Sequence, residues 1–335
     1  MRKLLALPWR KMPNPYPNML YLGLRSEGWK VSFVTNRKML GDKVGYLGEG
    51  DFLHYHWLSH LLEVSKSAAE AEERAALHAS MIDTAIAQGA QVIWTVHETI
   101  SPFAHYPQAQ LALSEKLAAA SVKIIQLTDA TAAAVAPHYA LDAAKLATLP
   151  HPSYQGLYPP HPAVDPDPAP SVGFFGRLTK EKNLPLLFDA VELARRSLPE
   201  LQLHVGGTLL PDSGLPADAG YEYIPLNDFP GHFLATDLLV LPDTAALSPN
   251  LVHCATSFGK PALLPDYPWL TAEFGHLPWI HFYPAQVDDR AASLAQEIVK
   301  LLPYTADHRA ECEIAARAYT TYDHAWRFVE LLADA

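Results

Sequence analysis

The sequence contains no long hydrophobic run. Although 49% of its 335 residues are hydrophobic, no apolar stretch reaches the ~20 residues that a membrane-spanning helix needs. The N-terminal segment MRKLLALPWRK has an apolar part that is too short for a secretory signal, and basic residues follow Trp9. We therefore interpret this segment as a first β-strand and expect a cytoplasmic protein.

Cysteine is scarce, and positive charge is unevenly distributed. Cys254 and Cys312 are the only cysteines, which excludes a disulfide framework and a cysteine-based metal cluster. The net charge of -11 argues against a general nucleic-acid binder. Residues 1–50 nevertheless hold nine Lys and Arg against three acidic residues, a net +6. Two interpretations stay open: a peripheral contact of this basic lobe with the inner face of the membrane, and scattered solvated side chains.

Short β-rich runs alternate with helical segments along the first half of the chain. The segment 67–88 is a clear helix, because it is rich in helix-forming residues and lacks Pro and Gly. Strand and helix alternation of this kind predicts an α/β fold with a parallel sheet covered on both faces. The expected strands are 3–9, 30–36, 52–57, 91–98, 123–128 and 146–152.

A proline-rich stretch, PSYQGLYPPHPAVDPDPAP, then interrupts the alternation at residues 152–170. Proline lacks an amide donor and fixes φ, so this stretch predicts a linker, residues 153–170, between two domains. The expected later strands are 171–177, 201–206, 221–226, 237–243, 261–265 and 279–283, and the helices are 184–197, 250–258, 290–302, 306–320 and 323–335. Two Rossmann-like domains, 1–152 and 171–320, would face each other across a cleft, with ligands beyond the carboxyl ends of the strands.

The segment 173–184, GFFGRLTKEKNL, has the composition of a diphosphate site. Gly176 lets a ligand approach the backbone closely at the end of a buried strand. Arg177 supplies a fork of donors suited to phosphate oxygens, and Lys182 stands at the entry of a helix whose N-terminus favours anions. An ordinary loop with exposed cations is the alternative interpretation.

The order of the following segments carries a family resemblance. GRLTKEKNLPLLFDAV is followed by LQLHVGGT, YEYIPL, ATDLLVLPD and SPNLVHCATSFGKPALLPD. This series resembles the donor domain of GT-B glycosyltransferases of family 4 (group 1), in a branch associated with bacterial exopolysaccharide assembly. The resemblance implies a metal-independent hexosyltransferase without a cofactor, using a UDP- or GDP-sugar and a glycan or polyprenyl-linked acceptor. It assigns donor binding to Gly176, Arg177, Lys182, Gly207, Ile224, Ser248, Pro249 and Asn250.

The helix expected at 250–258 has a recognisable start but lacks two glutamates that are usual in the family. Ser248 is a plausible N-cap, with Pro249 at the first helical position. The family usually places one glutamate before this helix and another eight positions later, where this chain has Ala246 and Cys254. Neither residue can accept strong hydrogen bonds as a carboxylate does, so the ribose partner and the stereochemistry stay open.

The resemblance extends to the first half of the chain and to its last helix. QVIWTVHE ends a predicted strand at His97, for which the family implies a contact with the donor sugar. FLHYHW resembles another strand end of the same branch, and alternation places His54 and His56 on one face. We expect no metal there, because no third ligand is evident. The helix 321–335 would cross back to the first domain, with Trp326 as a packing residue, and the cleft-lining candidates are Asn14, Tyr16, His56 and His151.

By resemblance the reaction is retaining, with the leaving phosphate helping to deprotonate the acceptor. An inverting reaction would need a general base, and His97 and Glu98 are the first candidates. A nicotinamide-dependent oxidoreductase is disfavoured because LPWRKMPNPYP stands where its glycine-rich loop would be. A non-catalytic GT-B protein that binds sugars or acts as a scaffold stays an alternative, because both family glutamates are missing.

Overall fold

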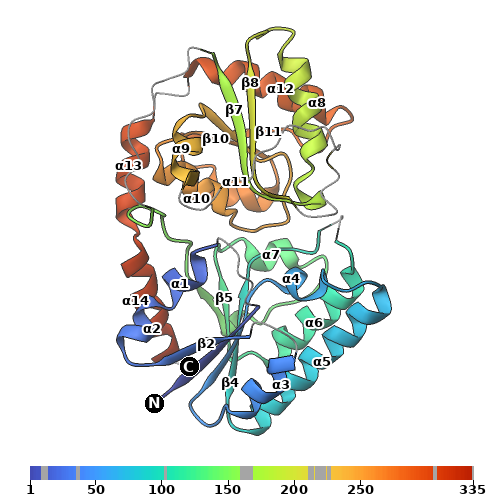
Figure 1. Ribbon diagram of the computed structural model, residues 1–335, viewed down its shortest axis with the longest axis vertical. Helices are drawn as coiled ribbons and strands as arrows, with labels where there is room; N and C mark the ends of the chain where they lie inside the picture. The colour runs from blue at the N-terminus through green and yellow to red at the C-terminus, as the bar shows by residue number, and fades with distance from the viewer. Residues whose placement is uncertain are drawn as a thin grey trace. The chain divides into compact units, whose positions relative to one another are not determined.

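The chain folds into two compact units (Figure 1). The computed structural model describes residues 1–8, 14–34, 38–101, 104–158, 169–209, 215, 224, 228–304 and 308–333. The first unit consists of Met1–His151 together with Thr321–Ala335, and the second of Pro152–Thr320. Most of the expected strand 221–226 and of the proline-rich stretch lies outside the described residues.

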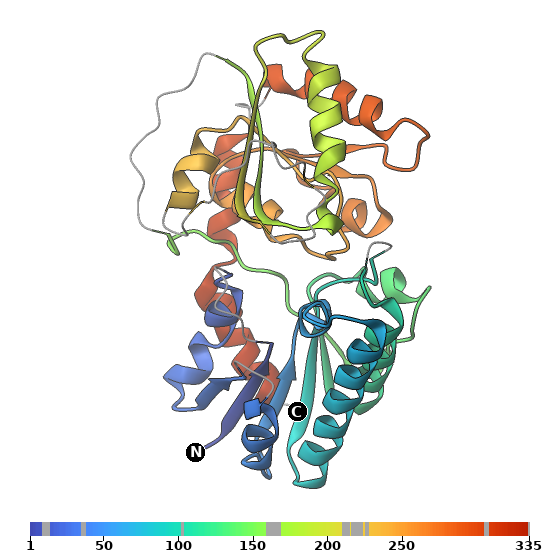
Figure 2. The same cartoon turned by 45° about the vertical axis from the view of Figure 1, so that its right-hand side comes forward.

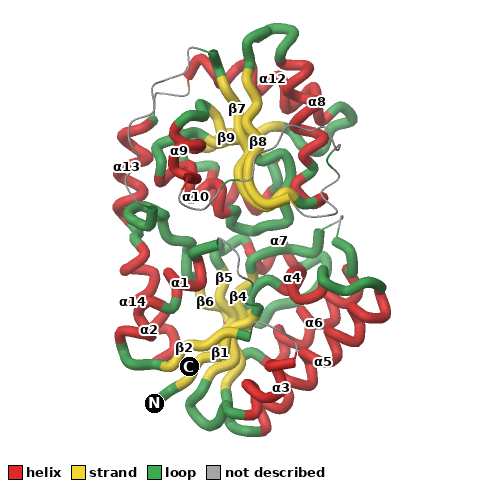
Figure 3. Tube along the Cα trace, in the orientation of Figure 1, coloured by secondary structure: helices red, strands yellow, loops and turns green. Residues whose placement is uncertain are grey.

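A six-stranded parallel sheet forms the centre of the first unit (Figure 3). Its order is β2-β1-β3-β4-β5-β6, so the direction of winding reverses between β1 and β3. In open α/β sheets ligands bind outside the carboxyl ends of the strands at such a reversal. The strands are β1 (Lys3–Leu7), β2 (Lys30–Phe33), β3 (Phe52–Tyr55), β4 (Gln91–Val96), β5 (Lys123–Gln126) and β6 (Leu146–Thr148).

Helices cover both faces of this sheet (Figure 2). On one face lie α3 (Lys38–Gly45), α5 (Ala68–Ala87) and α6 (Pro107–Ala120). The hydroxyl of Ser67 accepts a hydrogen bond from Glu70 N and so caps the start of α5. On the other face lie α1 (Tyr16–Leu20), α2 (Leu22–Ser26) and the last helix, α14 (Thr321–Ala333). Two short helices, α4 (Leu58–Leu62) and α7 (Thr131–Val135), follow β3 and β5.

One hydrophobic core of the first unit lies between the sheet and helices α1, α2 and α14. Because side chains alternate along a strand, one set of positions from each strand faces these helices. Phe328 and Leu332 of α14 are buried there although they are remote in sequence from the strands. The remaining buried members of this cluster are Leu4, Ala6, Tyr16, Leu20, Tyr21, Leu24, Phe52, Ile93, Ile125, Leu127 and Leu149.

A five-stranded parallel sheet forms the centre of the second unit, in the order β11-β10-β9-β7-β8. Its winding reverses between β7 and β9. The strands are β7 (Ser171–Leu178), β8 (Gln202–Leu209), β9 (Leu238–Val240), β10 (Ala262–Pro265) and β11 (Ile280–Tyr283). The helices are α8 (Leu184–Ala194), α9 (Phe229–Leu234), α10 (Asn250–Ser257), α11 (Pro268–Phe274), α12 (Arg290–Leu301) and α13 (Arg309–Ala318).

Both sheets are parallel and covered by helices, which confirms the predicted α/β class. Some strands end earlier than expected. The expected strand 91–98 ends at Val96, so His97 and Glu98 follow it as loop residues. Within the described part of the chain, no helix has the length and apolar character needed to cross a membrane.

Candidate functional site

Polar side chains extend the core face of the first sheet toward its carboxyl edge. His54 and His56 lie on one face of the chain at the end of β3, as predicted, with ring centroids 4.0 Å apart. On the neighbouring strand, Thr95 lies in β4 and His97 follows its end. The backbone N–H of His56 donates to Leu7 O of β1 at 2.7 Å. The histidines therefore lie where β1 and β3 meet, at the reversal of the winding.

Five side chains in this region form one continuous line of hydrogen bonds. Thr95 Oγ1 lies 2.8 Å from His54 Nε2, and the Tyr21 hydroxyl lies 2.8 Å from His54 Nδ1. The same hydroxyl lies 2.6 Å from His56 Nε2, and His56 Nδ1 lies 2.9 Å from His97 Nε2. Tyr21 comes from the junction of α1 and α2. The line thus connects two strands of the sheet through a helix residue.

Burial keeps the groups in this line uncharged at neutral pH. Desolvation lowers the pKa of His56 to about 3. The pKa of His54 falls well below its ordinary value because of burial and then the neighbouring His56, and that of His97 falls for the same two reasons. Burial also raises the pKa of Tyr21. Each imidazole therefore carries a single N–H, and each can donate one hydrogen bond and accept one.

Tyr16 brings the predicted first-unit candidates together. Its buried ring lies 5.2 Å from the ring of His97, 5.0 Å from that of His151 and 6.1 Å from that of His56, between centroids. The ring centroid of His324, in α14, lies 5.4 Å from that of Tyr16. Tyr16, His56, His97 and His151 were all predicted from the sequence. His324 was not, because the predicted crossing of the last helix to the first domain did not show which of its side chains would face Tyr16.

Asn14 and Glu98 have local structural partners. Asn14 Oδ1 accepts a hydrogen bond of 3.0 Å from Tyr16 N at the start of α1. Glu98 Oε1 accepts a hydrogen bond of 3.1 Å from Ser59 N in the first turn of α4. This contact occupies one oxygen of the carboxylate that the sequence had offered as an alternative base.

Glycines make β7 and β8 approach closely at the carboxyl edge of the second sheet. Gly176 and Gly207 are register partners with φ of 152° and 136°. A Cβ on Gly207 would lie 1.8 Å from Gly176 O, and a Cβ on Gly206 would lie 2.0 Å from Ile224 Cδ1. Ile224 is 2% exposed. Three predicted donor-site residues, Gly176, Gly207 and Ile224, therefore lie close to one another.

Arg177 and Lys182 follow Gly176 in the sequence. The expected strand 171–177 extends one residue further, to Leu178, with Arg177 paired in register with Thr208. The pairing continues because Gly176 and Gly207 lie opposite each other. Lys182 ends a single 3₁₀ turn, Lys180–Lys182, directly before α8. Both cations are partly buried, and both belong to the carboxyl edge beside the β7–β9 reversal.

Helix α10 begins at Asn250, as predicted, but its N-cap differs from the prediction. Pro249, with extended φ and ψ of −64° and 128°, is the N-cap, and Asn250 is the first helical residue. The expected N-cap role of Ser248 is therefore wrong by one position. The Ser248 hydroxyl instead lies 2.8 Å from His253 Nε2, one turn into the helix. Ser248 and Pro249 are buried, whereas Asn250 is exposed.

No protein-family model and no curated protein sequence matches the chain. Solved structures do match it. HepE from Anabaena, in complex with UDP and glucose, aligns with a TM-score of 0.71 at 16% identity over 100% of both chains. Sucrose-phosphate synthase from Thermosynechococcus elongatus gives 0.73 at 15% identity, over 100% of this chain and 99% of that one. The pneumococcal O-GlcNAc transferase GtfA gives 0.58 at 17% identity, over 89% of this chain and 59% of that one.

The fold is GT-B. Its two Rossmann-like units are the two parallel sheets described above, each with its own reversal of winding. The candidate donor residues lie at the reversal of the second unit and the candidate histidines at that of the first. The assignment of individual residues to donor or acceptor stays a prediction.

Ala246 and Cys254, which stand where the expected glutamates would be, make structural contacts. Ala246 O accepts a hydrogen bond of 3.3 Å from Trp269 Nε1. Cys254 is 5% exposed in α10, and burial raises the pKa of its thiol. Cys254 is therefore a small core residue, as the sequence suggested.

A buried carboxylate that the sequence analysis missed lies three residues after β9 of the GT-B second unit. Asp243 Oδ1 accepts a hydrogen bond of 2.7 Å from the Tyr267 hydroxyl, and Oδ2 lies 3.1 Å from an Arg290 nitrogen. Arg290 also donates to the Tyr283 hydroxyl at 2.9 Å. The only sequence signal for this carboxylate was that ATDLLVLPD ends in Asp243. Its partners, Tyr267 and Arg290, lie 24 and 47 residues further along the chain.

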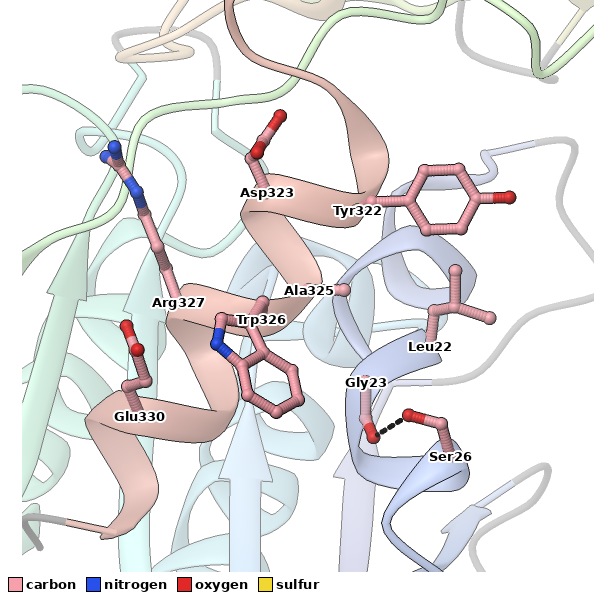
Figure 4. A pocket seen from close by; sticks show the side chains of 9 residues that line it. All are labelled: Leu22, Gly23, Ser26, Tyr322, Asp323, Ala325, Trp326, Arg327 and Glu330. Carbon is pink, nitrogen blue, oxygen red and sulfur yellow. Dashed lines mark hydrogen bonds between the residues drawn. The ribbon is translucent and has the colours of Figure 1, made fainter.

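A groove of about 680 Å³ lies between α2 and α14 of the first unit (Figure 4). Its lining includes Leu22, Tyr322, Arg327 and the ring of Trp326. Trp326 is 52% exposed, so its expected role as a packing residue is wrong. The opposite face of α14 makes the core contacts, through His324, Ala325, Phe328 and Leu332.

Among the described residues, no group of three or more His, Cys, Asp or Glu side chains is arranged to hold a metal ion. His54 and His56 use both ring nitrogens in the hydrogen-bonded line instead.

Proposed function

We propose that this protein is a glycosyltransferase that transfers a sugar from a UDP- or GDP-sugar to an acceptor hydroxyl. One observation carries the proposal: Arg177 and Lys182 follow Gly176 at the carboxyl end of β7, where Gly176 pairs with Gly207 and the winding of the second sheet reverses between β7 and β9. HepE, whose fold matches over the whole chain, has been solved with UDP and with UDP-glucose. That match supports a nucleotide-sugar donor here.

The donor diphosphate would bind at the glycine pair. Without side chains, Gly176 and Gly207 leave the backbone open to close approach. Arg177 would hold phosphate oxygens through paired N–H groups, and Lys182 would add a point charge at the entry of α8. The amides at the start of α10, near Ser248, Pro249 and Asn250, would face the same ligand. These groups would stabilise the nucleoside diphosphate as it leaves, without a metal ion or other cofactor.

His97 would contact the donor sugar from the first unit, next to Tyr16, His56 and His151. We further propose that the reaction retains the anomeric configuration, with the leaving phosphate assisting deprotonation of the acceptor. The resemblance to family 4 supports a glycan or polyprenyl-linked acceptor and a role in exopolysaccharide assembly. Anomeric analysis of the product by NMR separates retention from inversion.

The test begins with a thermal-shift panel of UDP-, GDP- and ADP-sugars and NAD, followed by hydrolysis or transfer with the sugar that binds. Removing one charge-assisted phosphate contact costs about 1.5–3 kcal/mol, so Arg177→Ala and Lys182→Ala should each weaken nucleoside-diphosphate affinity about 10- to 100-fold. His97→Ala should lower transfer far more than it lowers that affinity.

Arg196→Ala is the matched control for the cation variants. Arg196 is exposed and follows the far end of α8, whereas Lys182 precedes its start. Its loss should leave nucleotide affinity unchanged. Unaltered affinity in both Arg177→Ala and Lys182→Ala would contradict the donor site.

A non-catalytic sugar-binding or scaffold protein is the second candidate, favoured by Ala246 and Cys254 at the usual glutamate positions. The two candidates differ in turnover. A chain that binds a nucleotide-sugar with normal affinity but neither transfers nor hydrolyses the sugar would support the scaffold.

We also propose a peripheral contact of the first unit with anionic membranes. Exposed Arg2, Arg25 and Lys30 supply positive charge. Trp326 and Tyr322 supply exposed aromatic rings of the kind enriched at membrane interfaces. Co-sedimentation with phosphatidylglycerol vesicles, and none with phosphatidylcholine vesicles, is the expected result. No sedimentation with either would remove the proposal.

A further inference from the structure

The Tyr21 hydroxyl lies between two imidazole nitrogens and holds only one proton. It is within hydrogen-bond distance of His54 Nδ1 and His56 Nε2, at 2.8 and 2.6 Å. Tyr21 is fully buried, and these nitrogens are the partners of its hydroxyl among the described residues. The hydroxyl must therefore donate to one ring and accept from the other.

This restriction couples the tautomers of three histidines, because each neutral ring has one N–H. If Tyr21 donates to His54, then His54 and His56 both carry their proton on Nε2. If Tyr21 donates to His56, both carry it on Nδ1. In either case His97 follows His56, since His56 Nδ1 pairs with His97 Nε2. The three rings are thus all Nε2–H or all Nδ1–H.

Thr95 distinguishes the two patterns. In the Nε2–H pattern, His54 donates to Thr95 Oγ1, and the Thr95 hydroxyl proton needs a different acceptor. Thr95 is fully buried, and its hydroxyl bonds only His54 among the described residues. In the Nδ1–H pattern, Thr95 donates to His54 Nε2, and every proton along the line up to His97 has an acceptor. Each pattern leaves one donor without an acceptor among the described residues: the hydroxyl of Thr95, which is 0% exposed, in the Nε2–H pattern, and Nδ1–H of His97, which is 7% exposed, in the Nδ1–H pattern. A donor that water cannot reach is the costlier of the two, so the Nδ1–H pattern is favoured.

We propose that Thr95, His54 and Tyr21 are positioning residues that hold His97 as its Nδ1–H tautomer, so that His97 presents a hydrogen-bond donor to its ligand. The tautomer follows from the hydrogen-bonded line alone, whereas the ligand rests on the proposed function. His97 Nε2 is already occupied by His56, so Nδ1 is the nitrogen left to meet a ligand. As an N–H it can contact an oxygen of a sugar or phosphate, but it cannot remove a proton from an acceptor hydroxyl.

Nitrogen-15 spectra of the histidine side chains test the tautomer, because protonated and unprotonated ring nitrogens resonate far apart. The His97 signal is assigned by its loss in His97→Gln. At neutral pH, His54, His56 and His97 should all show a protonated Nδ1. A His97 protonated on Nε2 in the unaltered protein would overturn the proposal, whatever the variants do.

Two variants break the line at different points. Tyr21→Phe uncouples His54 from His56, so these rings should no longer share one tautomer. Thr95→Val removes the proton that favours Nδ1–H, so the ratio of Nδ1–H to Nε2–H in His97 should fall about tenfold, the equivalent of one buried hydrogen bond. Thr95→Ser keeps the hydroxyl and should keep the ratio. If both breaking variants fold and leave His97 fully Nδ1–H, the proposal fails.

Tyr55→Phe is the matched control. Tyr55 is a fully buried tyrosine in β3, and its hydroxyl lies 3.1 Å from His78 Nδ1, outside the line. Removing this hydroxyl should leave the His97 signals unchanged. A change in them equal to that in Tyr21→Phe would show that any loss of a buried hydroxyl perturbs the rings, and would overturn the specific role of Tyr21.

Kinetics give a second readout. Tyr21→Phe should lower kcat for transfer at least fivefold and leave nucleoside-diphosphate affinity unchanged, because that ligand is assigned to the other unit. A protein without transfer activity but with three Nδ1–H rings would contradict the proposed function only. An active protein with His97 as Nε2–H would contradict this inference only.

Discussion

Gly207 shows how closely two backbones approach at the carboxyl edge of the second sheet. Its φ of 136° is unfavourable for other residues, and a Cβ would lie 1.8 Å from Gly176 O. Because backbone cannot move aside cheaply, Gly207→Ala should destabilise the protein by about 3 kcal/mol. Chemical denaturation followed by circular dichroism measures the change.

Gly176→Ala separates backbone strain from the collision. Gly176 has a φ of 152°, but no atom outside its immediate chain neighbours lies within 4 Å of an added Cβ. Gly176→Ala should therefore lose less than half as much stability as Gly207→Ala. Equal losses in the two variants would show that the collision is not what makes Gly207 necessary.

At the scale of residues, the sequence predicted those parts of the first site that depend on strand periodicity. Alternation placed His54 and His56 on one face, and the strand end placed His97 at the carboxyl edge. Tyr21 was not predictable, because its role depends on how two five-residue helices cross the sheet. The same limit applies to Asp243, whose partners converge only in the folded chain.

At the scale of elements, the contact of α2 with α14 depends on one glycine. A Cβ on Gly23 would lie 2.6 Å from Ala325 O and 2.8 Å from Val329 Cγ2. Gly23→Ala should therefore push the helices apart and cost about 2 kcal/mol, despite the better helix propensity of alanine. Thermal unfolding monitored by tryptophan fluorescence, with Trp326 in the neighbouring groove, reports the effect.

Gly41→Ala, in α3, is the control for Gly23→Ala. An added Cβ at Gly41 has no neighbour within 4 Å, so this variant should be neutral or gain up to about 1 kcal/mol from helix propensity. If Gly23→Ala is equally neutral, α14 can shift away from α2 without loss of stability, and the prediction for Gly23 is wrong.

The elements themselves were largely predictable, and their ends were less so. The helix expected at 67–88 is α5, Ala68–Ala87, because its composition and its Ser67 cap agree. The start of α10 at Asn250 was predicted, but its N-cap was misplaced by one residue because both Ser248 and Pro249 are common at helix starts. The exposed face of α14 was also missed, since its pattern alone did not show which side Phe328 and Trp326 would take.

At the scale of the whole molecule, buried neutral histidines predict acid sensitivity. The pKa of His56 and that of His324 are both lowered by burial to about 3, from 6.5. Between these values the unfolded chain binds protons that the folded chain does not, so stability falls as pH falls. Each such histidine contributes up to about 1.4 kcal/mol per pH unit. Urea titrations at several pH values between 7.5 and 5 should show this slope.

His324→Gln should make the slope shallower by about one histidine, since glutamine does not titrate and can still donate a hydrogen bond. His276→Gln, at an exposed position, is the control for the substitution itself. An unchanged slope in His324→Gln would mean that His324 is not neutral in the folded protein.

The first unit is assembled from the two ends of the chain. Its sheet is synthesised early, but Phe328 and Leu332 cover the apolar face around Tyr21 and Phe52. Because domains generally fold during synthesis from the N-terminus, this face has to wait until the last helix leaves the ribosome. The second unit, which is continuous in sequence, can complete its core first. The second unit can thus complete its folding before the first, although the first is synthesised earlier. Until α14 emerges, the exposed apolar face of the first sheet is the part of the chain that most needs protection by chaperones.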